Sequence, residues 1–383
     1  MAGNNEIVQI EPKILEWART RINMSLFEAA EILKKDEETI KKWEQGIAQP
    51  TLAQLEKLAY TAYKIPLAVF YLPEPPEESP LKRQFRTIPD NEILSLPYEL
   101  MLSIKEGQYY QEVLKELFYD KNPAHSPIFK KYSELKLNDT IKIAQSIRID
   151  LNINKSIQSD FKNTAEAFKY YREKIEKKGV FVFQQTLKNY CRGYSLYDKE
   201  FPIVVINSSE LSGAGKNFTL FHELSHLLLN MGGLTNDYTY RSNDKEEIFC
   251  NKLAANILVD NNELLSDIHV KSNKSLEWDD EVLQLLAGKF KVSKEVILRK
   301  LLDMNLTTNS FYSSKREEWL EQFPQKRKGG GNFYKNRLSK LGNNYINAVL
   351  SSLYNGRINT YQASEYLNIK INQIPEIEKL VFE

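Results

Sequence analysis

The stretch KNFTLFHELSHLLLN, residues 216–230, contains two of the four histidines in the 383-residue chain. His222 and His226 stand four residues apart, so on a helix they share one face and can bind the same metal ion. Glu223 lies beside them, where it could accept a proton from a water that the metal activates. The other residues are largely apolar, which predicts a buried helix in which unpartnered histidines would be costly. The motif therefore predicts a zinc-dependent peptidase site.

A zinc site that keeps a position open for water needs a third protein ligand, which we expect from the next helix. That helix is predicted over DKEEIFCNKLAANILV, residues 244–259, where Glu246 and Glu247 are the candidates. Glu247 and Asn251 are similar to the Glu-x-x-x-Asp pattern of gluzincin peptidases, with Asn in place of Asp. This resemblance implies that Glu247 is the ligand and that Asn251 accepts a hydrogen bond from a ligating imidazole.

Short segments before the motif have the β-branched and aromatic composition of strands. They are KKGVFVFQQTL at 177–187, CRGYSLYD at 191–198 and FPIVVINSS at 201–209. After the motif, MGGLTND at 231–237 indicates a glycine-rich loop. Tyr238 and Tyr240, which follow it, are candidates for steadying the oxyanion of a peptidase reaction.

The bulk composition restricts the class of protein. The formal net charge of +1 gives no chain-wide attraction to nucleic acid or to an anionic membrane. The first residues lack the pattern of a secretory signal, and no window approaches the ~20 apolar residues of a membrane span. Cys191 and Cys250 are too few for a disulfide framework. We therefore expect a folded cytoplasmic protein with reduced thiols and no membrane partner.

Residues 177–260 resemble the ImmA/IrrE metallopeptidase family, also called DUF955. The resemblance rests on the GYSL and FPIVVINSS strands, the helix FTLFHELSHLLLN and the helix EEIFCNKLAANILVD, although Val259 and Asp260 replace the usual Met-Pro. It implies one zinc ion per chain and cleavage of a helix-turn-helix repressor or antitoxin-like protein, which would relieve repression.

Residues 12–66 read as four short helices with start signals at Ser25, Asp36 and Thr51. The segment SLFEAAEILKKDEETIKKWEQGIAQPTLAQLEKLA resembles an XRE-type helix-turn-helix, which implies binding to double-stranded DNA. Nine cations and nine anions between residues 11 and 64 cancel, so such binding would need cations gathered on one side. The candidates for that cluster are Lys34, Lys35, Lys41 and Lys42. A helical module for protein docking or dimerisation is the alternative.

These patterns predict a mostly helical α+β protein with a zincin-like (gluzincin) centre and a small sheet. The predicted parts are a helix-turn-helix domain (10–66), a proline-rich linker (67–91), a helical connecting region (92–176), a metallopeptidase domain (177–305), a flexible connector (306–335) and a helical C-terminal module (336–383).

Three functions remain open at this point. The first is a metallopeptidase with a regulatory N-terminal domain. The second is a transcriptional regulator or antitoxin with a structural or sensory zinc site, and the third is a component of a phage-defence or toxin–antitoxin system. The sequence leaves the oligomeric state, including a homodimer, undecided.

Overall fold

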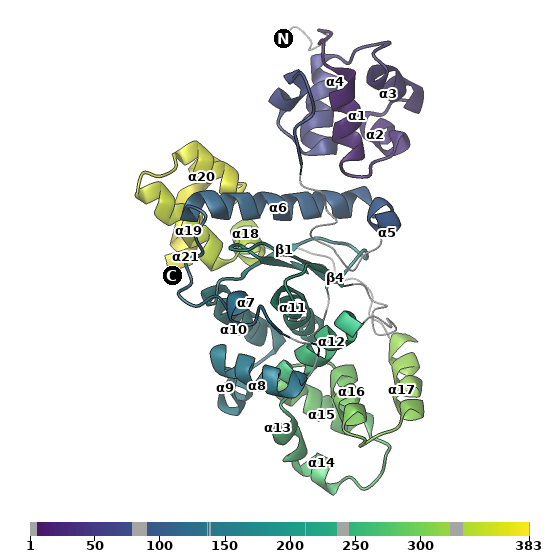
Figure 1. Cartoon of the computed structure of the whole chain (residues 1–383), viewed down its shortest axis with the longest axis vertical. Helices are drawn as coiled ribbons and strands as arrows, with labels where there is room; N and C mark the ends of the chain where they lie inside the picture. The colour runs from purple at the N-terminus through teal and green to yellow at the C-terminus, as the bar shows by residue number, and fades with distance from the viewer. Residues whose placement is uncertain are drawn as a thin grey trace. The chain divides into compact units, whose positions relative to one another are not determined.

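The computed structural model describes residues 6–78, 90–135, 137, 139–210, 212–235, 245–321 and 332–382. The chain forms two compact units, Met1–Gln108 and Tyr109–Glu383, and helix α6 (Tyr98–Phe118) contributes to both. Figure 1 labels the elements of each unit. The described residues are mostly helical with one four-stranded sheet, which confirms the predicted α+β class.

The first unit is helical, and polar side chains fix where its helices begin. Ser25 and Glu28 form a capping box at the start of α2, and Asp36 caps α3. Arg19 on α1 and Glu44 on α3 form two parallel contacts of 2.7 and 2.8 Å. The elements are α1 (Pro12–Thr20), α2 (Leu26–Leu33), α3 (Glu37–Glu44), α4 (Leu52–Lys57), the π-helix η1 (Leu58–Tyr63), the 3-10 helix η2 (Leu67–Tyr71), α5 (Asp90–Leu94) and the first half of α6.

The proline-rich linker predicted over 67–91 begins with a short helix, and residues 72–78 after it form neither helix nor strand. Residues Leu67–Tyr71 form η2, because Phe70 is fully buried and packs near the ring of Tyr63. Further along, Glu78 pairs with Arg21 at 2.8 Å. The chain that follows the four N-terminal helices therefore contributes to the core and surface of the same unit.

The second unit is built around a mixed sheet with strand order β1-β3-β2-β4. Its strands are β1 (Phe181–Gln185), β2 (Gly193–Leu196), β3 (Ile203–Asn207) and β4 (Gly233–Thr235). β1 and β3 are parallel, whereas β2 is antiparallel to both β3 and β4. Every residue of β1, β2 and β3 is buried, as expected for strands covered on both faces. β4 corrects the sequence prediction of a loop at 231–237.

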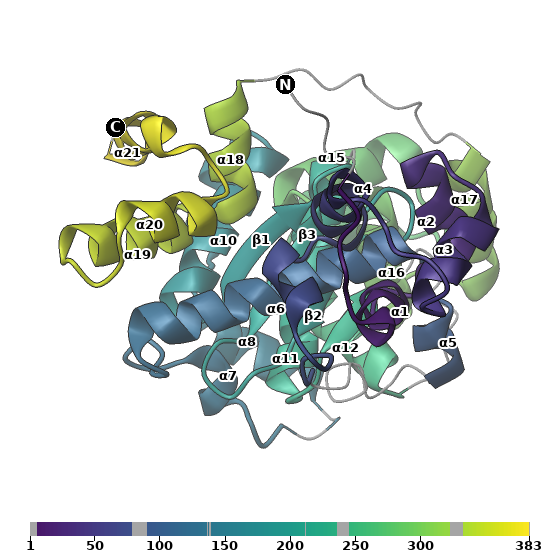
Figure 2. The same cartoon turned by 90° about the horizontal axis from the view of Figure 1, so that it is seen from above.

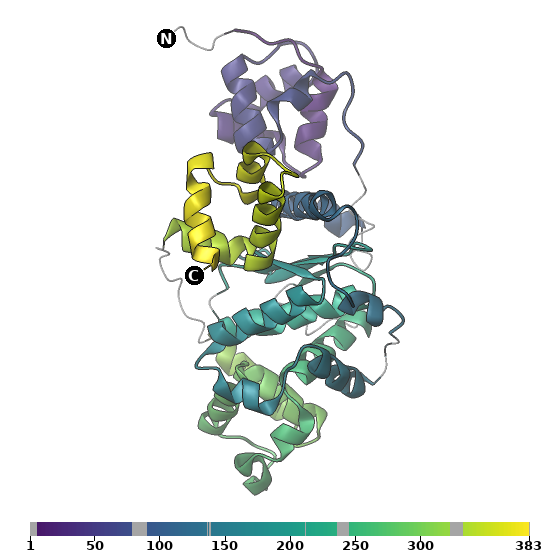
Figure 3. The ribbon, with the colours of Figure 1, turned by 90° about the vertical axis from the view of Figure 1, so that its left-hand side faces the viewer.

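Helices cover both faces of this sheet, as Figure 3 shows edge-on. α10 (Thr164–Lys177) and α11 (Gly213–Leu228) pack on one face. On the other face lies the part of α6 that starts at Tyr109, where Gln111 donates hydrogen bonds to the carbonyls of Leu196 and Phe201. The ring of Tyr110 stacks on Phe183.

The C-terminal helices pack against β1, the edge strand opposite β4 (Figure 2). A buried ion pair between Arg172 and Glu176 lies along the edge of β1 that pairs with no other strand. Arg172 donates a hydrogen bond to the carbonyl of Val182, and Glu176 accepts one from the Val182 N–H. Arg172 also donates to the carbonyl of Ser339 on α18 at 2.6 Å. These contacts satisfy the polar edge of the strand and attach the C-terminal helices to the second unit.

The second unit contains further helices, and one of them, α17, falls within the range 306–335 for which the sequence predicted a flexible connector. They are α7 (Ile128–Lys131), α8 (Thr140–Asp150), α9 (Lys155–Asp160), α12 (Lys245–Leu258), α13 (Asn261–Leu265), α14 (Ile268–Ser272), α15 (Asp280–Phe290), α16 (Lys294–Asp303), α17 (Asn309–Glu321), α18 (Phe333–Leu341), α19 (Asn343–Tyr354), α20 (Thr360–Leu367), η5 (Ile371–Gln373) and α21 (Ile374–Phe382). Among the described helices, none has the length and apolar character that a membrane span requires.

Candidate metal centre

Helix α11 carries the His-Glu-x-x-His motif through the core of the second unit. It begins at Ser212, whose side chain accepts a hydrogen bond from the backbone N–H of Gly215. Its apolar residues pack under the sheet and against α10 and α12. His222, Glu223 and His226 have no solvent exposure. The predicted buried helix is confirmed, and the motif lies at its centre.

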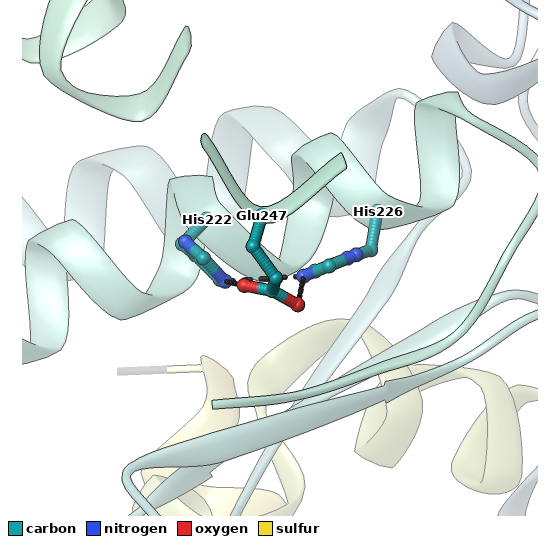
Figure 4. Close-up of side chains that lie close together, drawn as sticks. All are labelled: His222, His226 and Glu247. Atoms are coloured by element: carbon teal, nitrogen blue, oxygen red, sulfur yellow. Dashed lines mark hydrogen bonds and ion pairs between the residues drawn. The ribbon is translucent and has the colours of Figure 1, made fainter. Parts of the chain in front are cut away.

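Glu247, on α12, brings its carboxylate between the two imidazoles (Figure 4). Glu247 Oε2 lies 3.3 Å from His222 Nε2, and Glu247 Oε1 lies 3.2 Å from His226 Nε2. The two Nε2 atoms are 3.1 Å apart. The three side chains thus point their ligand atoms at one small volume between α11 and α12.

The spacing of these atoms fits a metal ion. Atoms that share a tetrahedral zinc ion at about 2.0–2.1 Å lie about 3.3 Å from one another, close to the three separations in this cluster. Two imidazole nitrogens and one carboxylate oxygen also form a donor set that is typical of catalytic zinc sites. The residues that are present therefore fit a zinc ion.

The electrostatics of the cluster keep Glu247 charged. Burial alone would raise the pKa of Glu247, but interactions with His222 and His226 hold it well below its ordinary value. For His226, burial lowers the pKa, whereas the neighbouring Cys250 and Glu247 raise it well above its ordinary value. An imidazole that binds a metal must release this proton, so proton binding and metal binding compete at His226.

Glu223 is held by a serine that the sequence analysis did not identify. Ser195, in β2, donates a hydrogen bond from Oγ to Glu223 Oε2 at 2.7 Å. Ser195 Oγ also accepts a hydrogen bond from the backbone N–H of Gly233, in β4, at 2.9 Å. Ser195 is fully buried in a strand, and a buried hydroxyl of this kind usually has a polar partner. The only sequence signal was one polar residue in the strand GYSL.

The sequence analysis also did not identify Gly233, which sets the distance between β4 and α11. A Cβ atom at this position would lie 2.3 Å from His226 Cδ2 and 2.6 Å from its Cγ. Only a residue without a side chain lets the strand lie this close to the imidazole. The Gly-rich sequence predicted a loop, whereas the structure uses this glycine for close packing.

The other predicted site residues lie apart from the cluster or outside the described residues. Asn251 lines a small adjoining cavity with Phe218 and Ile248, and it does not accept the predicted hydrogen bond, because the Nδ1 atoms of His222 and His226 have no hydrogen-bond partner among the described residues. Tyr238 and Tyr240 fall within 236–244, which the structure does not describe. In the first unit, the four predicted DNA-binding lysines are all exposed: Lys34 and Lys35 follow α2, and Lys41 and Lys42 lie in the last turn of α3.

The candidate centre lies within a segment that matches the model of a peptidase family. Residues 175–302 match the Peptidase_M78 model, described as the IrrE N-terminal-like domain. The match supports a metallopeptidase. It covers about a third of the chain, includes His222, Glu223, His226 and Glu247, and does not extend to the N-terminal helices. The match supports the ImmA/IrrE part of the resemblance. A comparison with curated proteins found no match.

Proposed function

We propose that the second unit is a zinc-dependent endopeptidase of the His-Glu-x-x-His type. The observation that carries this proposal is the convergence of His222, His226 and Glu247 on one buried point, with donor atoms 3.1 to 3.3 Å apart. His222, His226 and Glu247 would hold one zinc ion per chain. When bound, zinc supplies a Lewis acid that polarises a carbonyl and lowers the pKa of water.

Glu223 is the residue that moves the proton. Its carboxylate follows His222 directly in the motif and can accept a proton from water and pass it to the leaving amine. Ser195 orients this carboxylate through the 2.7 Å hydrogen bond. Because Ser195 is itself fixed by the backbone of Gly233, the position of the base is set by two strands of the sheet.

We further propose that the substrate is a helix-turn-helix repressor or an antitoxin-like protein in the cytoplasm, whose cleavage relieves repression. The likeness to the IrrE-type domain supports this substrate class, as does the N-terminal module of the chain itself. Such a pairing would make the peptidase part of a regulatory switch.

The cleavage experiment uses the full chain loaded with zinc and the helix-turn-helix protein encoded by the adjacent gene. We expect defined fragments with the wild-type chain and none with Glu223→Gln, since loss of a general base lowers the rate by about 10² to 10⁴-fold. Glu246→Gln, a change of the same chemistry beside the ligand, is the matched control and should cleave normally. Fragments that persist unchanged with Glu223→Gln would refute the proposed role of Glu223.

The N-terminal helices support a second activity, binding to double-stranded DNA. Helices α2 and α3 pack against each other, and Lys41 and Lys42 are exposed on α3. Glu37 and Glu38 are exposed at the start of the same helix, which would oppose a polyanion there. We expect Lys41→Gln to weaken binding in a mobility-shift assay and to lower the salt slope by about one unit, with Lys13→Gln on α1 as control.

A transcriptional regulator with a structural or sensory zinc site is the second candidate, favoured by the compact separate first unit. The mobility-shift and cleavage assays together distinguish the regulator from the peptidase. A sequence-specific, salt-sensitive shift with no proteolysis of any partner would support the regulator, whereas cleavage that depends on Glu223 supports the peptidase.

A further inference from the structure

A cavity of about 210 Å³ lies in the second unit, beside the amino-terminal end of α11. Gly215 and Phe218 of α11, Val296 of α16 and Trp319 of α17 contribute to its walls. None of these residues takes part in the metal cluster. The volume is below the ~300 Å³ at which typical small-molecule sites begin, but it is sufficient for one large side chain.

The cavity lies along the same face of α11 as the metal-binding histidines. Gly215, Phe218, His222 and His226 follow one another at intervals of three or four residues, which places them on one side of the helix. The rings of Phe218 and His222 have their centroids 6.2 Å apart. At a rise of 1.5 Å per residue, the cavity begins about 6 Å from His222 along the helix axis and continues to about 10 Å at Gly215.

These distances match the spacing of side chains along an extended peptide. A strand advances about 3.3 Å per residue, so a substrate with its cleaved bond at the metal cluster would bring a neighbouring side chain to the cavity. The residue that reaches it is two or three positions from the cleaved bond, on one side only.

The chemistry of the walls selects the kind of side chain. Phe218 and Val296 are buried and apolar, and Trp319 adds an aromatic wall. Each charged group at the cavity already has a partner of opposite charge: Arg316 lies 2.9 Å from Glu295, Arg192 lies 3.8 Å from Glu210, and Lys294 pairs with Asp280. A charged substrate side chain would have to give up its bound water and disrupt these ion pairs. An apolar side chain requires neither change.

We propose that this cavity is a specificity pocket that binds a bulky apolar side chain of the protein substrate near the cleaved bond. The proposal rests on the proposed peptidase function and names the residues that select its substrate. Trp319 is the residue best suited to a test, because it lines the pocket from α17 and lies outside the metal-binding helices.

The experiment uses the zinc-loaded full chain and a library of decapeptides with every position randomised, with cleavage sites read by mass spectrometry. We expect the wild-type chain to prefer Leu, Met or Phe about tenfold over Ala at one position within three residues of the cut, because a hydrophobic pocket discriminates by at least about tenfold against a side chain that lacks methylenes. Trp319→Ala should reduce this preference at least fivefold at that position alone. Trp319→Phe should retain it, and Glu317→Ala, an exposed change on the same helix, should leave it unchanged.

Binding gives a second readout that does not require turnover. A labelled peptide with the preferred side chain should bind the inactive Glu223→Gln chain and lose affinity when Trp319→Ala is added. A preference for Asp or Glu at the position, or a Trp319→Ala profile identical to wild type, would overturn the pocket while leaving the peptidase intact. No cleavage of any library member and no peptide binding would instead count against both the pocket and the proposed function.

Discussion

Ser195 Oγ donates a 2.7 Å hydrogen bond to the carboxylate of Glu223, and so connects strand β2 to the base of the proposed reaction. The two residues are 28 positions apart in the sequence and both are fully buried. The same hydroxyl accepts from the N–H of Gly233 in β4. The orientation of Glu223 is therefore determined by the sheet as well as by its own helix.

Replacing Ser195 with Ala should lower kcat by about tenfold, because one hydrogen bond to a charged group is worth about 1.5 kcal/mol. Zinc content and KM should stay close to wild type, since Ser195 contacts neither the metal ligands nor the cavity. The measurement is steady-state kinetics together with metal analysis. Ser225→Ala is the matched control, because that buried hydroxyl donates to the carbonyl of Phe221 in its own helix. Equal loss in both variants would mean that the Ser195–Glu223 contact has no specific role.

Replacing Gly233 with Ala should disturb zinc binding more than folding. The new methyl group would lie 2.3 Å from His226 Cδ2, so the imidazole or the strand must move. We expect zinc affinity to fall by at least about tenfold, as is common when the residues that orient a metal ligand are changed. Titration of the metal-free protein with zinc gives the measurement.

Gly288→Ala provides the control for that substitution. Gly288 lies in α15, and a Cβ atom there meets no atom within 4 Å. A methyl group in open space inside a helix should leave zinc affinity unchanged and increase stability by about 0.5–1 kcal/mol. Similar zinc affinities for the two alanine variants would show that the contact between β4 and His226 is not important.

The sequence predicted much of the second unit because its signals are local. Three strands and two site helices follow from the β-branched runs and from the helical spacing around His222 and Glu247. β4 was missed because it has only three residues, and its pairing with β2 is a long-range contact. Ser195 and Gly233 were missed for the same reason, since neither has a role until β2, β4 and α11 come together.

In two segments that the sequence predicted to be connectors, the structure contains helices. The predicted proline-rich linker begins at residue 67, but burial of Phe70 holds residues 67–71 in a 3-10 helix. Likewise, α17 lies within the range predicted as a flexible connector, and its Trp319 packs under Lys294 of α16. In both places tertiary contacts outweighed the local composition.

The lowered pKa of Lys300 predicts that the stability of the protein depends on pH. Lys300 is almost fully buried, hydrogen-bonded to Asn256 and Asn261, and burial lowers its pKa to about 8. In the unfolded chain Lys300 stays protonated up to about pH 10.4. Above pH 8 the unfolded chain therefore binds more protons at this residue than the folded chain does. Stability contributed by this site should therefore rise with pH from about 8 to 9.5.

Denaturant unfolding of wild type and Lys300→Met at pH 7.5, 8.5 and 9.5 isolates this contribution. The difference in unfolding free energy between the two proteins should change by about 1–2 kcal/mol in favour of wild type across the series. A flat difference for Lys300→Met would show that Lys300 titrates at its ordinary pKa in the folded protein.

The central claim is that His222, His226 and Glu247 bind zinc. Calorimetric titration of zinc into the metal-free full chain tests it most directly. Wild type and Glu223→Gln should both bind one zinc ion with similar affinity, because Glu223 is the base and not a ligand. Glu247→Gln should bind at least about 100-fold more weakly, since one of three protein ligands is impaired, and Glu246→Gln should match wild type. Wild-type affinity in Glu247→Gln, or no zinc binding by the wild-type chain, would contradict the site formed by His222, His226 and Glu247.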